Sequence, residues 1–84
     1  MSSRIVVIGL GYVGLPLAVA LARRFPTTGF DISAERISEL HRGIDRTDEV
    51  APAVLRASTL KLSARPEDIR GADIYIVTVP TPVV

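Results

Sequence analysis

Three glycines, Gly9, Gly11 and Gly14, constrain this 84-residue chain more than any other feature of its sequence. They follow the β-branched residues 4–8 and open a stretch, residues 13–24, in which small and apolar side chains recur at helical spacing. In this setting the G-x-G-x-x-G pattern is typical of a strand-to-helix turn that binds a dinucleotide pyrophosphate. Gly9 permits the tight turn, Gly11 lets the backbone approach the phosphates, and Gly14 lets the helix lie close to the strand. The alternative is that the glycines only form a tight turn.

Strand-like and helix-like segments alternate along the chain. Residues 4–8 and 74–79 are continuously apolar, which is typical of strands buried on both faces of a parallel sheet. The whole pattern predicts strands over residues 4–8, 27–32, 60–62 and 74–79 and helices over residues 13–24, 34–42, 52–57 and 66–70. Ser33 is the expected N-cap of the second helix, and Gly43 its left-handed end. This order predicts an α/β protein: the N-terminal half of a Rossmann (doubly wound) fold, with a parallel sheet of about four strands in the order 3-2-1-4.

Composition and charge narrow the class of protein. The chain is 48% hydrophobic and 23% charged, which is enough apolar material for one packed domain. Its 10 basic and 9 acidic residues are scattered and give a net charge of +1, which argues against nucleic acid or an anionic membrane as a partner. The apolar residues 14–25 are too few to span a bilayer. Without cysteine the chain has no disulfide or thiolate metal site, and we expect a cytoplasmic protein.

An acidic residue stands where a dinucleotide site needs one. Asp31 closes the second predicted strand, 22 residues after Gly9, and its carboxylate would accept hydrogen bonds from the adenosine ribose hydroxyls. The same charge would repel a 2′-phosphate, so NAD is expected rather than NADP. The alternative is that Asp31 caps the next helix, for which Ser33 is better placed. Arg36 either reaches over the adenosine ribose or is an exposed helix arginine; if it accommodated a 2′-phosphate, the preference for NAD would weaken.

Other polar residues suggest no metal or catalytic centre. His41 is the only histidine, lies at the end of a helix without acids at metal spacing, and is expected on the surface. Asp45, Asp48 and Glu49 do not form a cation-binding ladder, so we expect a solvated loop there. The sequence therefore predicts no metal site and no catalytic residue. Two aromatic residues are expected in the core rather than as stacking platforms: Phe30 and Tyr75.

The glycine motif continues into a more specific pattern. Residues 9–18, with Tyr12-Val13 between the second and third glycines and Leu15-Pro16 after them, resemble the amino terminus of the UDP-glucose/GDP-mannose dehydrogenase family. Further stretches resemble the branch that oxidises UDP-N-acetylhexosamines, in which Pro80 replaces an asparagine more usual in the UDP-glucose branch. These stretches are residues 29–32, Arg36, residues 45–47 and residues 78–82.

The resemblance implies a set of cofactor contacts. Matching positions of this chain would contact NAD, and Thr81 also lies beyond the fourth strand, at the sheet edge where such folds bind ligands. The full set is Gly9, Gly11, Tyr12, Val13, Gly14, Asp31, Arg36 and Thr81. In the family, a downstream cysteine with lysine and asparagine helpers oxidises the sugar C6 alcohol to a carboxylate in two hydride transfers.

None of those downstream residues occurs in this chain. We therefore expect residues 1–84 to be a truncated NAD-binding domain, without the remaining NAD-domain strands, the central domain and the UDP-binding domain. The chain alone is expected to be inactive. As part of a whole enzyme it would serve oxidation of a UDP-N-acetylhexosamine, or a UDP-hexose, to the uronic acid for polysaccharide synthesis.

Other functions stay open at this point. The chain is alternatively a stand-alone nucleotide-binding or regulatory module, a structural remnant without cofactor affinity, or part of a flavin or other NAD family. A sheet that ends with residues 74–79 leaves an unpaired strand edge and an uncovered apolar face. We therefore expect self-association through this strand or the exposed sheet face.

Overall fold

The computed structural model describes residues 3–78 and has the predicted α/β architecture. Its four strands form one parallel sheet in the order β3-β2-β1-β4, as predicted. The strands are β1 (Ile5–Ile8), β2 (Thr27–Phe30), β3 (Lys61–Ser63) and β4 (Ile74–Val77). The helices are α1 (Gly14–Ala22), α2 (Ala34–His41), α3 (Pro52–Ala57) and the 3-10 helix η1 (Pro66–Ile69).

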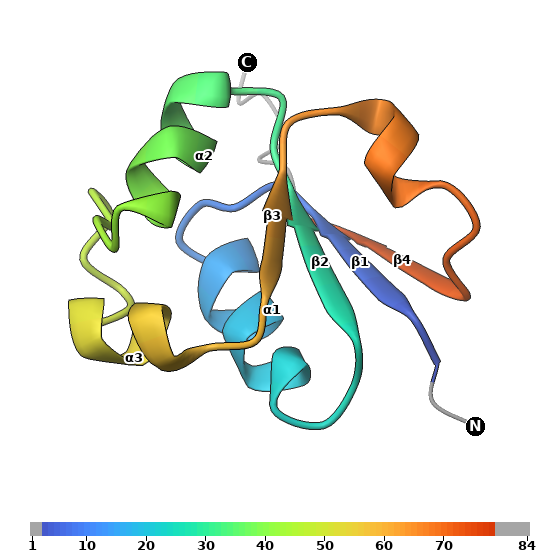
Figure 1. Cartoon of the computed structure of the whole chain (residues 1–84), viewed down its shortest axis with the longest axis horizontal. Coiled ribbons are helices and arrows are strands. Elements are labelled where there is room, and N and C mark those ends of the chain that lie inside the picture. The colour runs from blue at the N-terminus through green and yellow to red at the C-terminus, as the bar shows by residue number, and fades with distance from the viewer. Residues whose placement is uncertain (1–2, 79–84) are drawn as a thin grey trace, which may run out of the picture.

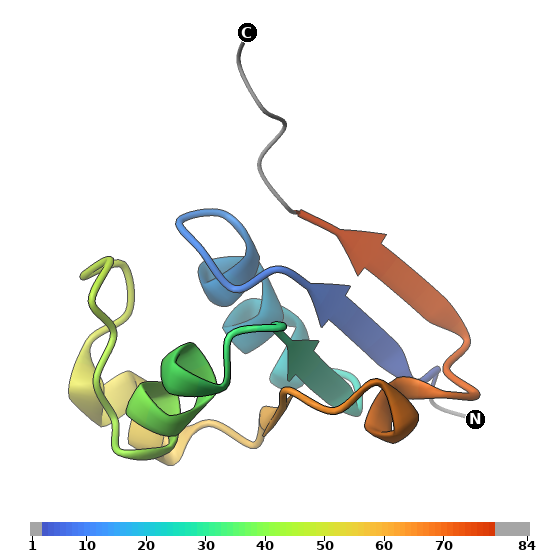
Figure 2. The same ribbon diagram turned by 90° about the horizontal axis from the view of Figure 1, so that it is seen from above.

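The register of the sheet brings three strand ends together. Ile8 at the end of β1 lies opposite Phe30 of β2 on one side and Val77 of β4 on the other. Because all strands are parallel, the residues that follow them emerge at the same edge of the sheet, as the arrows in Figure 2 show. The glycine loop, Asp31 and Thr78 therefore meet at this edge.

Helices cover the two faces of the sheet unequally. Figure 1 shows α1, α2 and α3 on one side and only the short η1 on the other. The core lies between the sheet and α1–α2, and its fully buried side chains include Val7, Leu10, Leu15 and Ala18. Burial of these apolar groups is the main force that holds the β1–α1 unit together.

The fourth strand differs from the prediction. Ile74, Tyr75 and Val77 are exposed, so the expectation of a strand buried on both faces is wrong for residues 74–77. The reason is its place at the sheet edge: within residues 3–78, β4 pairs only with β1, and little covers either face. Tyr75 is thus not a core residue; its hydroxyl donates to the Ile69 carbonyl at 2.5 Å. Phe30 is buried, as expected.

Element ends shift by one or two residues. The first helix ends at Ala22 rather than residue 24, because the N–H groups of Arg24 and Phe25 both donate to the Leu21 carbonyl in a tightened last turn. Ser33 caps α2 as predicted, and Gly43 has a φ of 78°. No helix within residues 3–78 is long and apolar enough to cross a membrane.

Candidate functional site

The glycine loop leaves β1 through a bend that requires glycine. Gly9 has a φ of 96°, a left-handed conformation that side chains disfavour, and its N–H donates to the Phe30 carbonyl at 2.8 Å. Gly14 begins α1 in contact with this bend: a Cβ there would lie 1.7 Å from the Gly9 carbonyl oxygen and 2.3 Å from Thr78 Oγ1. The predicted tight turn and close helix approach are both confirmed.

Gly11 is different from its two neighbours in the motif. A Cβ on Gly11 would meet no atom of the chain within 4 Å, and Gly11 is not among the residues with positive φ. Neither packing nor backbone strain within the described residues requires glycine here. An open space beside bare backbone is what the approach of a pyrophosphate needs.

The start of α1 offers an anion the N–H groups that precede Leu15, since those of Leu15 and Leu17 already donate to loop carbonyls and Pro16 has none. Val13 precedes the helix without a side-chain cap, and the first turn holds no acidic residue. Helix starts leave backbone N–H groups unpaired and carry a partial positive charge, which together favour phosphate. Tyr12 and Val13 are 69% and 67% exposed, so their side chains leave the loop backbone accessible. The corner therefore fits a dinucleotide diphosphate.

Asp31 binds the glycine loop directly. Its Oδ2 accepts the Leu10 N–H at 3.0 Å, and its Oδ1 accepts the Ser33 N–H at 2.9 Å. A carboxylate has about four acceptor positions, so two remain for ribose hydroxyls. Ser33 Oγ accepts the Arg36 N–H at 3.2 Å and is the cap of α2, so capping of this helix does not account for Asp31.

Arg36 is buried, and its interpretation as an exposed helix arginine is wrong. Only 8% of the residue is exposed. Its Nε and Nη2 donate to the Leu10 carbonyl at 2.9 and 2.5 Å, and its Nη1 lies 3.0 Å from Asp45 Oδ1. The guanidinium thus joins the glycine loop to the loop after α2.

Asp45 was expected in a solvated loop, and this is wrong. Its side chain is 1% exposed, and it accepts hydrogen bonds from the N–H groups of Thr47, Glu49 and Val50 and from the Thr47 hydroxyl. Burial raises the pKa of Asp45, but the Thr47 hydroxyl, the N–H groups of Val50 and Thr47, and Arg36 outweigh it and lower the pKa from 3.8 to about 2. Asp48 and Glu49 are exposed, as is His41, as predicted.

Thr78 is a residue of this corner that the sequence reasoning missed. Its N–H donates to the Ile8 carbonyl at 2.8 Å, and its hydroxyl lies 2.6 Å from the Gly9 carbonyl oxygen. The predicted strand order contained the signal, because it places the end of the fourth strand beside the end of the first. Thr81, the remaining predicted cofactor contact, lies outside the described residues.

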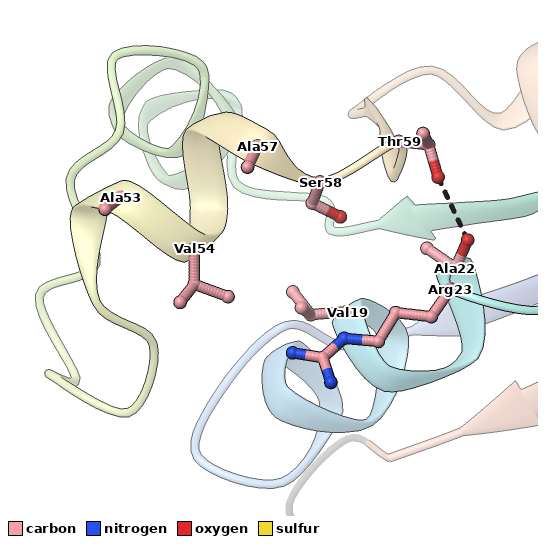
Figure 3. A pocket seen from close by; sticks show the side chains of 8 residues that line it. All are labelled: Val19, Ala22, Arg23, Ala53, Val54, Ala57, Ser58 and Thr59. Atoms are coloured by element: carbon pink, nitrogen blue, oxygen red, sulfur yellow. Dashed lines mark hydrogen bonds between the residues drawn. The ribbon is translucent and has the colours of Figure 1, made fainter.

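A well-formed hollow lies away from this chemistry. It has a volume of about 470 Å³ and lies between the C-terminal end of α1 and α3 (Figure 3). Its lining is mostly apolar, with Arg23 as the one charged side chain, and a hydrogen bond from Thr59 Oγ1 to the Ala22 carbonyl closes one side. The polar groups that could bind a dinucleotide converge at the other end of α1, so we place the candidate site there.

The sequence matches a known family along almost its whole length. The model of the UDP-glucose/GDP-mannose dehydrogenase family, NAD binding domain, matches residues 3–84. UDP-N-acetyl-D-glucosamine 6-dehydrogenase of Pseudomonas aeruginosa is 48% identical over 81 residues, which are 95% of this chain and 19% of that protein. Protein CapL of Staphylococcus aureus is 43% identical over 83 residues, 99% of this chain and 20% of that protein. The chain spans about a fifth of the length of these curated relatives.

Solved structures of nucleotide-sugar dehydrogenases match the fold of this chain. UDP-D-ManNAc dehydrogenase from Pyrococcus horikoshii matches with a TM-score of 0.82 and 36% identity over 96% of this chain and 21% of that one. A ternary complex of GDP-mannose dehydrogenase from Pseudomonas aeruginosa matches with a TM-score of 0.76 and 27% identity over 94% of this chain and 20% of that one. On the sequence match, the strand order and the geometry of the glycine corner together, the chain belongs to the UDP-glucose/GDP-mannose dehydrogenase family, whose NAD binding domain it matches.

Proposed function

We propose that this chain binds NAD at the β1–α1 corner, as the cofactor-binding part of a nucleotide-sugar 6-dehydrogenase. Gly9, Gly11 and Gly14 with the backbone of Tyr12 and Val13 would hold the diphosphate, and Asp31 would hold the adenosine ribose. When bound, NAD supplies a hydride acceptor. The observation that carries the proposal is the hydrogen bond from the Leu10 N–H to Asp31 Oδ2, because it sets the ribose acceptor beside the phosphate-binding loop.

The substrate proposal is a UDP-N-acetylhexosamine, oxidised to its uronic acid for polysaccharide synthesis by a protein that includes this chain. It rests on the residue patterns 29–32 and 78–82 and on the names of the relatives. A UDP-hexose is the second choice. Thr81 stays a predicted cofactor contact, and a cytoplasmic location stays a prediction. Because this chain has no cysteine, we expect it to form no NADH when mixed with NAD and a UDP-sugar.

Titration calorimetry of the chain with NAD and with NADP tests the cofactor. We expect NAD to bind more tightly than NADP, and Asp31→Ala to weaken NAD by about tenfold or more because it removes charge-assisted hydrogen bonds to the ribose. Asp31→Asn, which keeps the shape but not the charge, should narrow the difference between NAD and NADP.

Glu67→Ala is the matched control, since it removes an exposed negative charge on η1, on the opposite side of the sheet from the three α-helices. It should leave both affinities unchanged. If the parent chain gives no heat with either nucleotide, a structural remnant without cofactor affinity is favoured. If Asp31→Ala binds NAD as tightly as the parent chain, the contact between Asp31 and the ribose is refuted.

The exposed edge of the sheet supports a second element of the proposal. Within residues 3–78, β4 pairs with a strand on one side, so the backbone groups on its other side can pair with another strand. Its exposed apolar side chains add surface that such a strand could cover. We propose that copies of this chain associate through β4. Light scattering that shows only monomer at high concentration would refute this association.

A further inference from the structure

Arg36 is a buried arginine with every guanidinium nitrogen engaged. Nε and Nη2 donate to the Leu10 carbonyl, and Nη1 forms an ion pair with Asp45. Arginine is rarely buried unless it is paired, because removing its charge from water is costly. A guanidinium has five N–H groups, so the contacts to Leu10 and Asp45 explain the burial of Arg36 without using all of its donors.

Leu10 is the residue that Arg36 holds, and it lies between the first two glycines of the motif. Its side chain is fully buried and packs against β2, where a Cβ on Gly29 would lie 2.9 Å from Leu10 Cδ2. Its N–H is bound by Asp31 and its carbonyl by Arg36. Asp31, directly after β2, and Arg36 of α2 therefore fix both peptide groups of the Gly9–Gly11 segment.

Asp45 provides the charge that lets Arg36 stay buried. The carboxylate lies 3.0 Å from Arg36 Nη1 and is itself held by three N–H groups and one hydroxyl of residues 47–50. An unpaired buried charge would be strongly destabilising, so loss of Asp45 should release Arg36 from Leu10. The loop after α2 is thereby coupled to the glycine loop.

We propose that Arg36 and Asp45 form a positioning pair that holds the Leu10–Gly11 peptide in the conformation that binds the diphosphate. The inference rests on the proposed NAD binding.

Two measurements on the 84-residue chain test this pair. Calorimetry gives the NAD affinity, and the backbone amide resonance of Gly11 reports the Leu10 carbonyl, because both belong to one peptide group. The variants are Arg36→Met, Arg36→Lys and Asp45→Asn. Arg46→Met is the control: Arg46 is also a paired arginine, but its partners are two carboxylates of α2, those of the exposed Glu35 and the partly buried Glu39.

We expect Asp45→Asn and Arg36→Met each to weaken NAD binding by about tenfold or more and to shift the Gly11 resonance before any ligand is added. Lysine at position 36 carries one ammonium and cannot serve the carbonyl and the carboxylate as the planar guanidinium does, so Arg36→Lys should restore only part of the affinity. The variant that combines Arg36→Met with Asp45→Asn should bind NAD no more weakly than Arg36→Met alone, since both changes break one unit. Arg46→Met should match the parent chain in both measurements.

The result that overturns the inference is a normal NAD affinity and a normal Gly11 resonance in Asp45→Asn. A loss confined to Arg36→Met, with no shift of Gly11 in the free chain, would instead show direct cofactor contact. If Arg36→Met does not fold, Asp45→Asn and Arg36→Lys decide by the same measurements. If the parent chain does not bind NAD, the proposed function fails, and the Gly11 resonance of these two variants still decides whether the pair holds the loop.

Discussion

β1 and β4 lie side by side in the sheet, with Ile5 opposite Ile74 and Ile8 opposite Val77, yet their surroundings differ completely. β1 has a paired strand on each side, helix α1 packed against it, and a glycine loop whose peptides are bound by Asp31 and Arg36. Within residues 3–78, β4 has one neighbouring strand, and most of its side chains are exposed. Similar apolar sequences thus give a fixed corner in one place and an open edge in the other, because burial depends on what packs around a strand.

The largest expected effect comes from breaking the corner at Gly14. Gly14→Ala would place a methyl group 1.7 Å from the Gly9 carbonyl oxygen, so α1 or the loop must move. We expect the free energy of unfolding to fall by about 2–4 kcal/mol and NAD binding to be lost. Urea unfolding followed by circular dichroism measures the first, and calorimetry the second.

Gly11→Ala is the matched control for this change. Its methyl group would enter open space, and alanine restricts the unfolded chain, so stability should rise by about 0.5 kcal/mol. NAD binding should nevertheless weaken, because the methyl group occupies the space assigned to the diphosphate. Equal stability of the two variants would mean that helix α1 does not depend on its contact with Gly9.

Acid titration of the parent chain and of Asp45→Asn measures how much the Asp45 carboxylate supports the glycine corner. The pKa of Asp45 is about 2 in the folded chain and 3.8 ordinarily, so its contribution of roughly 2 kcal/mol is complete above pH 3.8 and is lost as the pH falls through about 2. Asp45→Asn should be less stable than the parent at pH 6, and the difference should be small at pH 2 and vanish below it. Unfolding in urea across this pH range measures it.

Glu67 provides the control for acid titration. Its pKa is also lowered, by its own backbone N–H and by the Arg65 side chain, but it is exposed on η1. Glu67→Gln should therefore follow the stability curve of the parent chain closely. A curve for Asp45→Asn that runs parallel to that of the parent at every pH would show that the Asp45 carboxylate does not stabilise the fold.

The smallest effect on folding is expected at the edge. Val77 is 63% exposed, so Val77→Lys should change the free energy of unfolding by about 0.5 kcal/mol or less. A charge on an edge strand opposes strand pairing, so light scattering should show a lower apparent mass at high concentration. Ile44→Lys, an exposed apolar residue away from the sheet, should keep the mass of the parent. A large loss of stability in Val77→Lys would mean that β4 is not the open edge described here.

Local patterns were sufficient for much of the fold and for part of the site. The glycine spacing predicted the bend at Gly9 and the close contact at Gly14, and alternation of apolar runs with helical stretches predicted the strand order. Ser33 and Gly43 were predicted correctly because a helix cap and a left-handed helix end depend on neighbouring residues only. Asp31 was placed at the loop because parallel strands end at one edge of the sheet.

Tertiary structure decided the features that depend on partners far along the chain. Arg36 reads as an ordinary helix residue, and its burial arises only because the fold brings it to Leu10, 26 residues earlier, and to Asp45. Asp45 reads as a loop acid, and it is buried because this cation and four donors surround it. An apolar run such as residues 74–77 specifies a strand, but whether that strand is covered depends on the elements that pack beside it, and no pattern within the strand itself carries this information.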